Sequence, residues 1–253
     1  PSGSSQADLL RPLRLPTILV GSSVLGGISS TRASFESLRM RGYDIDVVLM
    51  FTSPYYGNDT YLAQYFVEHG IPLFTIEKPP ARMADTPTDV ARMQTYYQHT
   101  LTTMAEVVQY LADQHVRRYA SLDTLGMRAH QHMWWPFTQH TRVAPQDVTI
   151  VDSAHSDFFE AHAPGQGTSP MMDGSASWWT QAVGHGHPRL ALAAAYAAGR
   201  YGHVLSPSVA HEPAVRLAER LLGHDSSATL APGRGWASRA FFTDDGSTSM
   251  EVA

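Results

Sequence analysis

Three short apolar segments, separated by stretches with helical patterning, constrain the fold of this chain most strongly. They cover residues 17–21, 45–51 and 71–76, and each is almost continuously apolar. Strands of this kind are buried on both faces, as in a parallel sheet covered by helices. A long helix is predicted after them, over about residues 88–114. Residues 17–115 are therefore predicted to form the later strand and helix units of a doubly wound α/β fold.

The pattern changes in the second half of the chain. Helical periodicity fades after residue 115, which predicts a linker. Beyond it the sequence predicts strands at residues 148–152 and 238–243, helices at about 188–200 and 213–222, and a new helix at the end. The predicted division is therefore a first part at residues 1–115, a linker at 116–132 and a second part at 133–253.

Charge and composition narrow the kinds of partner that this chain can bind. The 18 Lys and Arg residues are scattered and the formal net charge is -5, which argues against a nucleic-acid partner. No apolar run reaches the ~18 residues of a membrane-spanning helix, and no secretory signal is evident. The chain has no Cys, and its 13 His lack the spacing typical of zinc sites, so we expect no metal site.

The clearest chemical signal lies at residues 241–253, where a predicted strand leads into the turn Gly246-Ser247-Thr248 and a new helix. Such a turn presents unpaired backbone N–H groups, the positive end of a helix dipole and hydroxyl donors, a combination that suits a phosphate group. The alternative is that Asp245, Ser247 or Thr248 only caps the helix. The local pattern leaves both interpretations open.

Two aromatic clusters are further candidates for a binding site. Trp178 and Trp179 follow a turn at Asp173-Gly174, and Phe137 ends the cluster that begins at Trp134. In an extended segment neighbouring side chains face opposite sides, which would place one indole against a substrate and the other in the core. Structural packing explains either cluster equally well. The Gly-rich loop at residues 21–27 resembles a phosphate cradle but lacks a Walker-type lysine.

Five motifs in the second half, taken in order, resemble the N-terminal part of diaminopelargonic acid aminotransferases, which are fold-type I pyridoxal phosphate enzymes. The motifs are Trp135-Pro136-Phe137-Thr138, Asp173-Gly174 with Ser177-Trp178-Trp179, Gly202-His203-Val204, His211-Glu212-Pro213-Ala214, and Asp245-Gly246-Ser247-Thr248 followed by Glu251-Val252-Ala253. The resemblance implies that Gly246 and Ser247 hold the phosphate of pyridoxal phosphate. It also implies that Trp178, Trp179 and Phe137 lie beside the substrate, 8-amino-7-oxononanoate, without the hydroxyl that bacterial members often carry at position 137.

Residues from about 8 to 115 resemble the C-terminal half of dethiobiotin synthetase, a P-loop-type α/β enzyme. The matching residues are Leu15-Pro16, Ile18-Leu19-Val20-Gly21, Leu25-Gly26-Gly27-Ile28-Ser29 and Arg41-Gly42-Tyr43-Asp44. The resemblance implies that Leu25, Gly26, Gly27 and Ser29 lie near the carboxylate of diaminopelargonate at a dimer interface. Val24 and Ser29 depart from the basic residue and the Asn that bacterial synthetases often carry at these positions.

The order of the two halves resembles the fused bifunctional enzyme of plants and fungi, which implies a mitochondrial homodimer in biotin synthesis. The complete protein is then expected to transfer an amino group from S-adenosylmethionine to 8-amino-7-oxononanoate. It is also expected to close the ureido ring of dethiobiotin with carbon dioxide, ATP and Mg²⁺. Lys78 is the only lysine and lies in the synthetase-like half, so both catalytic lysines are expected outside this chain, which alone is expected to be inactive.

Two other interpretations stay open. Another class III aminotransferase would share the Gly-Ser phosphate turn, although the Trp178-Trp179 pair and the synthetase-like half argue against it. The other is a non-catalytic interaction protein derived from the same folds. The departures at Val24, Ser29 and Ser206, where Ser206 replaces an aromatic residue, are its support.

Overall fold

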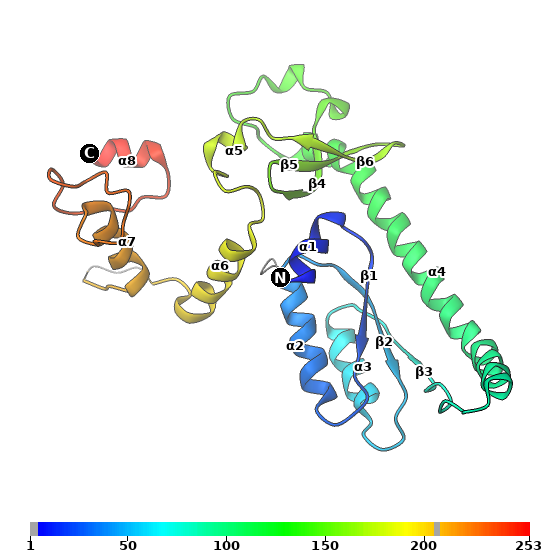
Figure 1. Ribbon diagram of the computed structural model, residues 1–253. Coiled ribbons are helices and arrows are strands. Elements are labelled where there is room, and N and C mark those ends of the chain that lie inside the picture. The colour runs from blue at the N-terminus through cyan, green and yellow to red at the C-terminus, as the bar shows by residue number, and fades with distance from the viewer. Residues whose placement is uncertain (1–4, 205–207) are drawn as a thin grey trace. The chain divides into compact units, whose positions relative to one another are not determined.

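The computed structural model describes residues 5–204 and 208–253 (Figure 1). The chain forms two compact units, Pro1–Tyr196 and Ala197–Ala253. The first unit contains a parallel and an antiparallel sheet of three strands each. Ser206, a departure from the family pattern, lies outside the described residues.

A parallel sheet forms the centre of the first half, as the apolar segments predict. Its strands are β1 (Thr17–Gly21), β2 (Ile45–Phe51) and β3 (Leu73–Ile76), and β2 lies in the middle. Val47 and Val48 in β2 are completely buried. Because these neighbours face opposite sides, both faces of the sheet are covered, which explains the continuous apolar pattern.

Two helices pack together on one face of this sheet (Figure 1). They are α2 (Gly27–Arg39) and α3 (Asn58–Glu68). Phe35 of α2 meets Phe66 of α3 edge to face, with the ring centroids 5.2 Å apart, and Met50 of β2 completes the core beneath them. Burying large apolar side chains of this kind stabilises the fold by roughly 1.5–3 kcal/mol each.

A single long helix, α4 (Thr86–His132), covers the opposite face. Successive strand residues face opposite sides of a sheet. Leu73 of β3 packs in the core with α2 and α3, whereas its neighbour Phe74 contacts Tyr110 of α4, with the ring centroids 6.4 Å apart. The parallel sheet is therefore enclosed between helices on both faces.

The helix α4 continues through residues 116–132, for which the sequence predicts a linker. This part buries Leu122 and Gly126, and a Cβ on Gly126 would lie 2.6 Å from the backbone oxygen of Pro145. Its packed face is short and is partly made of glycine backbone, which hydropathy periodicity does not reveal. The segment is thus helical, while the division of the chain into two domains stays a prediction.

The second sheet is an antiparallel meander. Its strands are β4 (Ile150–His155), β5 (Phe158–Ala163) and β6 (Gly167–Met172). The sequence predicts only the first, at residues 148–152. β6 contains Pro170, which lacks a backbone N–H and obscures the strand pattern, but an edge strand such as β6 tolerates proline.

The helices predicted in the rest of the chain form close to their expected places. They are α6 (Pro188–Tyr201), α7 (Glu212–Leu222) and α8 (Gly246–Val252), of which α7 and α8 belong to the second unit. The short element α5 (Ala176–Trp179), which precedes α6, is not among the predicted helices. The shorter helical elements are α1 (Gln6–Leu10) and the 3₁₀ turns η1 (Arg11–Leu13), η2 (His140–Arg142) and η3 (Pro145–Asp147).

The strand predicted at residues 238–243 does not form. These residues make no strand pairing within the described part of the chain. A strand needs a neighbour for its backbone N–H and C=O groups, and the second unit offers α7 and α8 but no adjacent strand among its described residues. The apolar pattern of this segment therefore fails to predict its structure.

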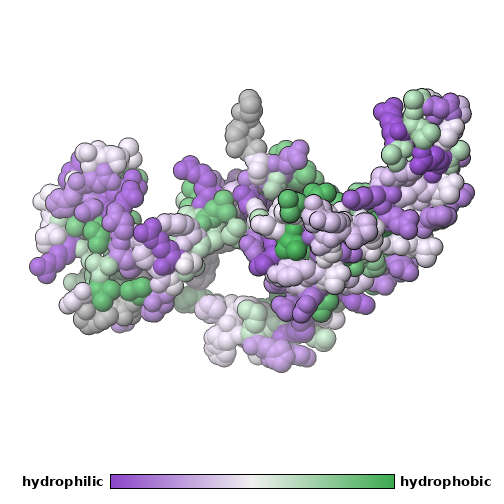
Figure 2. Space-filling view, turned by 90° about the horizontal axis from the view of Figure 1, so that it is seen from below, coloured by the Kyte–Doolittle hydropathy of each residue, from purple (hydrophilic) through white to green (hydrophobic). Residues whose placement is uncertain are grey.

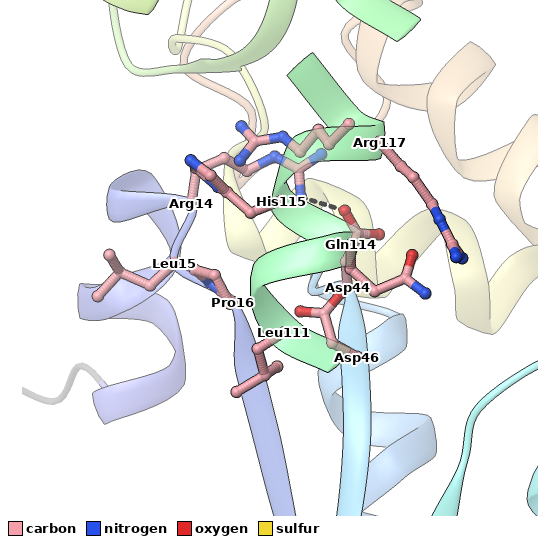
Figure 3. Close-up of a pocket in the computed structure, with 10 residues that line it drawn as sticks. Arg14, Leu15, Pro16, Asp44, Asp46, Leu111, Gln114, His115 and Arg117 are labelled. Carbon is pink, nitrogen blue, oxygen red and sulfur yellow. Dashed lines mark hydrogen bonds and ion pairs between the residues drawn. The ribbon is translucent and has the colours of Figure 1, made fainter. Parts of the chain in front are cut away.

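A buried carboxylate connects the two sheets of the first unit. Asp152 of β4 has a side chain only 4% exposed and pairs with Arg118 of α4. Arg14, just before β1, places Nε 3.6 Å from the same carboxylate and also pairs with Asp44 at 2.5 Å. Arg14, Asp44 and Arg118 line a cavity of about 310 Å³ at the amino ends of β1 and β2 (Figure 3). Burial raises the pKa of Asp46, which also lines it.

Hydrophobic side chains reach the surface in separate patches among hydrophilic ones (Figure 2). The exposed large apolar residues include Leu25, Tyr55, Phe137 and Trp179. Within the described ranges, no helix combines the length and the apolar character that crossing a bilayer requires.

Replacing Asp152 by Ala should lower the free energy of unfolding by about 3 kcal/mol, because two arginines would lose their common buried partner. Urea unfolding measures this change. Asp157→Ala, which changes an exposed aspartate in the turn between β4 and β5, is the matched control and should stay within about 0.5 kcal/mol of the unmodified chain. Equal effects of the two substitutions would contradict a connecting role for Asp152.

Candidate functional site

The loop that follows β1 is held by its own glycine and by an asparagine from α3. A Cβ on Gly27 would lie 2.0 Å from the backbone oxygen of Ser22 and 2.7 Å from Nδ2 of Asn58, so only glycine fits. Asn58 is buried, and its Nδ2 donates to the carbonyl oxygens of Ser22 and Val24 at 3.1 and 2.9 Å. The loop is thereby fixed at the carboxyl end of β1, the edge of a parallel sheet where ligands bind.

A surface pocket of about 580 Å³ opens beside this loop. Leu25, Gly26 and Ser29, three of the four predicted substrate-binding residues of this half, line it together with Arg32 and Asn58. Sequence reasoning missed these last two. Arg32 follows Ser29 by three positions on the same helix, a spacing that places both on one face and would have revealed it. Asn58 comes from a different helix, and no sequence spacing points to it.

The guanidinium of Arg32 is held by aromatic neighbours. Its Cζ lies 4.5 Å from the ring centroid of Tyr65, and its Nη1 donates to the hydroxyl of Tyr61 at 3.4 Å. The carboxylate of Glu36 lies 4.0 Å from Nη2, one turn further along α2. The side chain of Arg32 is nevertheless 40% exposed. The pocket therefore contains a fixed positive charge that remains accessible from solvent.

The segment Ala176–Trp179 is a left-handed turn rather than the extended segment that its sequence predicts. The φ angles of its four residues lie between 47° and 66°. This conformation costs non-glycine residues roughly 1–2 kcal/mol each, so the surrounding contacts must hold it. Both indoles are exposed, Trp178 by 66% and Trp179 by 88%. The expected placement of one indole in the core is wrong, because it assumed the alternation of a strand.

Phe137 lies against Trp178 in the first unit. Their ring centroids are 5.9 Å apart and their planes are inclined at 41°. Phe137 is 94% exposed, so the pair presents an open apolar surface. The structure thus brings together two aromatic residues that the sequence predicts at a substrate site. Such rings suit an aliphatic chain.

In the second unit, Asp245 caps α8. Its carboxylate accepts a hydrogen bond from the backbone N–H of Thr248 at 2.8 Å, and this bond helps to hold the pKa of Asp245 below its ordinary value. Within the described residues, the hydroxyl of Ser247 has no hydrogen-bond partner. A Cβ added to Gly246 would meet no heavy atom within 4 Å. Because Asp245 provides the cap, the Ser247 hydroxyl beside the open space at Gly246 remains available to a ligand.

Several histidines make pairwise contacts with aspartates. His185 pairs with Asp173 and His162 pairs with Asp123, each at 2.8 Å. Across the described ranges, no group of three His, Asp or Glu side chains is arranged to hold a metal ion.

Comparison with known proteins decides the family. Residues 164–253 match the aminotransferase class-III family. Over its whole length the chain is 45% identical to a bifunctional dethiobiotin synthetase/adenosylmethionine-8-amino-7-oxononanoate aminotransferase from Emericella nidulans, of which it covers 33%. The chain belongs to this bifunctional family. It spans about a third of the length of these relatives.

Two further relatives agree with this assignment. A bifunctional dethiobiotin synthetase/7,8-diamino-pelargonic acid aminotransferase of Oryza sativa subsp. japonica, named as mitochondrial, is 38% identical over 100% of the chain and 29% of its own length. An adenosylmethionine-8-amino-7-oxononanoate aminotransferase of Synechococcus elongatus is 34% identical over 50% of the chain and 27% of its own length. The bifunctional family matches the whole chain, whereas the single-function aminotransferase matches half of it.

A class-III aminotransferase domain implies pyridoxal phosphate as its cofactor. The start of α8 fits the phosphate end of that group, because an unpaired hydroxyl lies next to a glycine that leaves room for it. The Asp245 carboxylate already accepts the Thr248 amide. Gly246 and the Ser247 hydroxyl are therefore the groups that would hold the phosphate.

Gly27→Ala should disrupt the loop after β1, because its Cβ cannot avoid the backbone oxygen of Ser22. We expect a loss in the free energy of unfolding beyond the ~3 kcal/mol of ordinary substitutions. Gly26→Ala is the control, since its Cβ would meet nothing within 4 Å and only its φ of 79° is unfavourable, at a cost of about 1 kcal/mol. Thermal or urea unfolding ranks the two variants, and a milder effect at Gly27 would refute the close approach.

Proposed function

We propose that the complete protein catalyses two steps of biotin biosynthesis. The first transfers an amino group from S-adenosylmethionine to 8-amino-7-oxononanoate, giving 7,8-diaminopelargonate. The second closes the ureido ring of dethiobiotin with carbon dioxide and ATP. The observation that carries the proposal is the pairing of exposed Phe137 and Trp178, because a substrate with a long aliphatic chain needs such an apolar surface. The names of the bifunctional relatives support both reactions.

In the transamination half, Phe137 and Trp178 contact the methylene groups of the substrate, and Trp179 extends this surface. Apolar contact and exclusion of water orient the chain without involving the reacting atoms. Pyridoxal phosphate, when bound, supplies the electron sink for amino-group transfer. Gly246 and Ser247 would hold its phosphate through a backbone amide and a hydroxyl, as charge-assisted hydrogen bonds.

In the synthetase half, the pocket beside Leu25, Gly26 and Ser29 receives the carboxylate tail of diaminopelargonate, with Gly27 shaping the loop. Val24 supplies no charge there, and Arg32 provides the cation instead, since its accessible guanidinium lies in the same pocket. ATP with Mg²⁺, when bound to this half of the complete protein, would supply the phosphoryl group that activates a carbamate. We assign this half to the P-loop-type α/β fold because its parallel sheet is enclosed by helices.

The assembly and location of the protein are part of the same proposal. The loop at Leu25–Ser29 would lie at the interface of a homodimer, as the resemblance to the synthetase implies. A mitochondrial location is supported by the name of the rice relative. The two activities in one protein would place the consumer of diaminopelargonate beside its producer.

The complete protein should form diaminopelargonate from 8-amino-7-oxononanoate and S-adenosylmethionine, and dethiobiotin once ATP, Mg²⁺ and bicarbonate are added. Mass spectrometry of the products measures both steps. Arg32→Gln should raise the KM for diaminopelargonate about tenfold, because one charge-assisted contact to the carboxylate is lost. Arg39→Gln on the same helix, outside the pocket, is the control. Failure to form either product would refute the corresponding half of the proposal.

Ser247→Ala should weaken binding of pyridoxal phosphate roughly tenfold to a hundredfold, since it removes one hydrogen bond to a charged group, worth ~1.5–3 kcal/mol. Titration of the cofactor-free complete protein measures the affinity. Ser249→Ala makes the same change two positions later, where the hydroxyl donates to the backbone oxygen of Asp245, and should leave the affinity unchanged. If Ser247 only stabilised the helix, its removal would lower the melting temperature without changing the affinity.

A further inference from the structure

The carboxylate of Asp173 lies at the start of the turn that carries the two exposed tryptophans. Its side chain is only 5% exposed and accepts three side-chain hydrogen bonds. Ser175 donates to Oδ1 at 3.0 Å, and Ser177 donates to Oδ2 at 2.9 Å. Nε2 of His185 lies 2.8 Å from the same Oδ2.

These hydrogen bonds tie the turn to the second sheet. The backbone N–H of Asp173 donates to the carbonyl oxygen of Asp157 at 2.8 Å, at the end of the β5–β6 pairing. His185 exchanges two backbone hydrogen bonds with Ser156, at 3.2 and 2.7 Å. The ring of His185 also lies 4.9 Å from that of Phe159, a residue of β5. Asp173 therefore connects a strained turn on one side to a firmly placed sheet on the other.

Besides this carboxylate, the turn is held by backbone hydrogen bonds, such as that from the N–H of Trp179 to the carbonyl oxygen of Ser175 at 2.9 Å, and by the contact of Trp178 with Phe137. Its residues from Ala176 to Trp179 all have positive φ, a conformation that L-residues leave when nothing constrains them. Both indoles project into solvent, so core packing does not fix them. Ser177 lies inside the turn and is bound directly by the carboxylate. The hydrogen bond between Ser177 and Asp173 thus helps to set the direction in which the following residue, Trp178, points.

Electrostatics favours an ionised carboxylate in this position. Burial raises the pKa of Asp173, but the hydrogen bonds from His185, Ser177 and Ser175 outweigh it and leave the pKa below its ordinary value. At neutral pH the group is therefore charged, and all three hydrogen bonds that it accepts are charge-assisted. A neutral amide at the same place would accept weaker hydrogen bonds and would offer an N–H₂ group to one of the donors.

We propose that Asp173 is a positioning residue that holds Trp178 and Trp179 against the aliphatic chain of the transamination substrate. This inference rests on the proposed transamination. The tryptophans contact methylene groups that do not change during the reaction, so the contact contributes equally to the bound substrate and to the transition state. Loss of such a contact raises KM and leaves kcat unchanged.

The experiment compares Asp173→Asn, Asp173→Ala and Ser177→Ala in the complete protein, with Asp157→Asn as the matched control. Steady-state transamination gives kcat and the KM for 8-amino-7-oxononanoate. Hydrogen exchange of the peptide that spans residues 173–181, read by mass spectrometry, reports the order of the turn without depending on activity. Titration with pyridoxal phosphate checks that the cofactor site is intact.

For Asp173→Asn we expect KM to rise about tenfold with kcat nearly unchanged, together with faster exchange in residues 173–181. Ser177→Ala should give a smaller rise in KM, because it removes one hydrogen bond and leaves the carboxylate in place. Asp157→Asn should change neither quantity, and cofactor affinity should be the same in all variants. Asp173→Asn and Ser177→Ala keep the test decisive if Asp173→Ala fails to fold.

Two outcomes would overturn the inference in distinguishable ways. Faster exchange with an unchanged KM would show that Asp173 serves only the local structure, while the proposed transamination would stand. Absence of transamination by the unmodified protein would refute the proposed function and this inference with it.

Discussion

The first unit depends on one buried carboxylate. Asp152 lies on β4, yet its partners come from α4 and from the segment before β1, so a single charge joins the antiparallel sheet to the parallel one. A buried ion pair of this kind adds little net stability relative to apolar packing, but it tolerates only one arrangement of its members. Arg118 and Arg14 must both reach the same point, and this requirement fixes how the two sheets meet.

The two ends of the parallel sheet carry different groups of side chains. At the amino ends of β1 and β2, charged groups neutralise each other, as Arg14 does with Asp44. At the carboxyl end of β1, the loop is shaped by Gly27 and Asn58 and opens onto a pocket where Arg32 keeps an accessible charge. The proposed ligand pocket is thus separated from the structural ion pairs by the length of the strands. This separation agrees with the general placement of ligand sites in parallel α/β sheets.

Sequence patterns predicted the elements that are governed by local periodicity and missed those governed by distant contacts. The buried strands β1, β2 and β3 and the helices α6 and α7 follow directly from apolar spacing. The strand β6 is not predicted because Pro170 interrupts the residue pattern typical of a strand. The helix over residues 116–132 is not predicted because Gly126 packs through its backbone, which leaves no apolar side chain in the pattern at that position. In each case the structure depends on a contact with residues too far along the chain to contribute to a local sequence pattern.

The candidate sites show the same limit. Ser29 indicates Arg32 through helical spacing, but Asn58 reaches the pocket from another element. The sequence left open whether Ser247 or Asp245 caps α8, and only the geometry of the hydrogen bond to Thr248 assigns the cap to Asp245. The left-handed turn at Trp178 was not predicted either, because its conformation depends on a carboxylate held by the neighbouring sheet.

The unbroken course of α4 has a consequence for how proteins of this family can change over time. A flexible connection tolerates insertions and deletions, because added residues only lengthen it. A helix that packs against both sheets does not, since each residue inserted within it turns everything beyond by about 100° and advances it by about 1.5 Å. Length changes between the two halves should therefore accumulate outside α4, in the segments that enter and leave it.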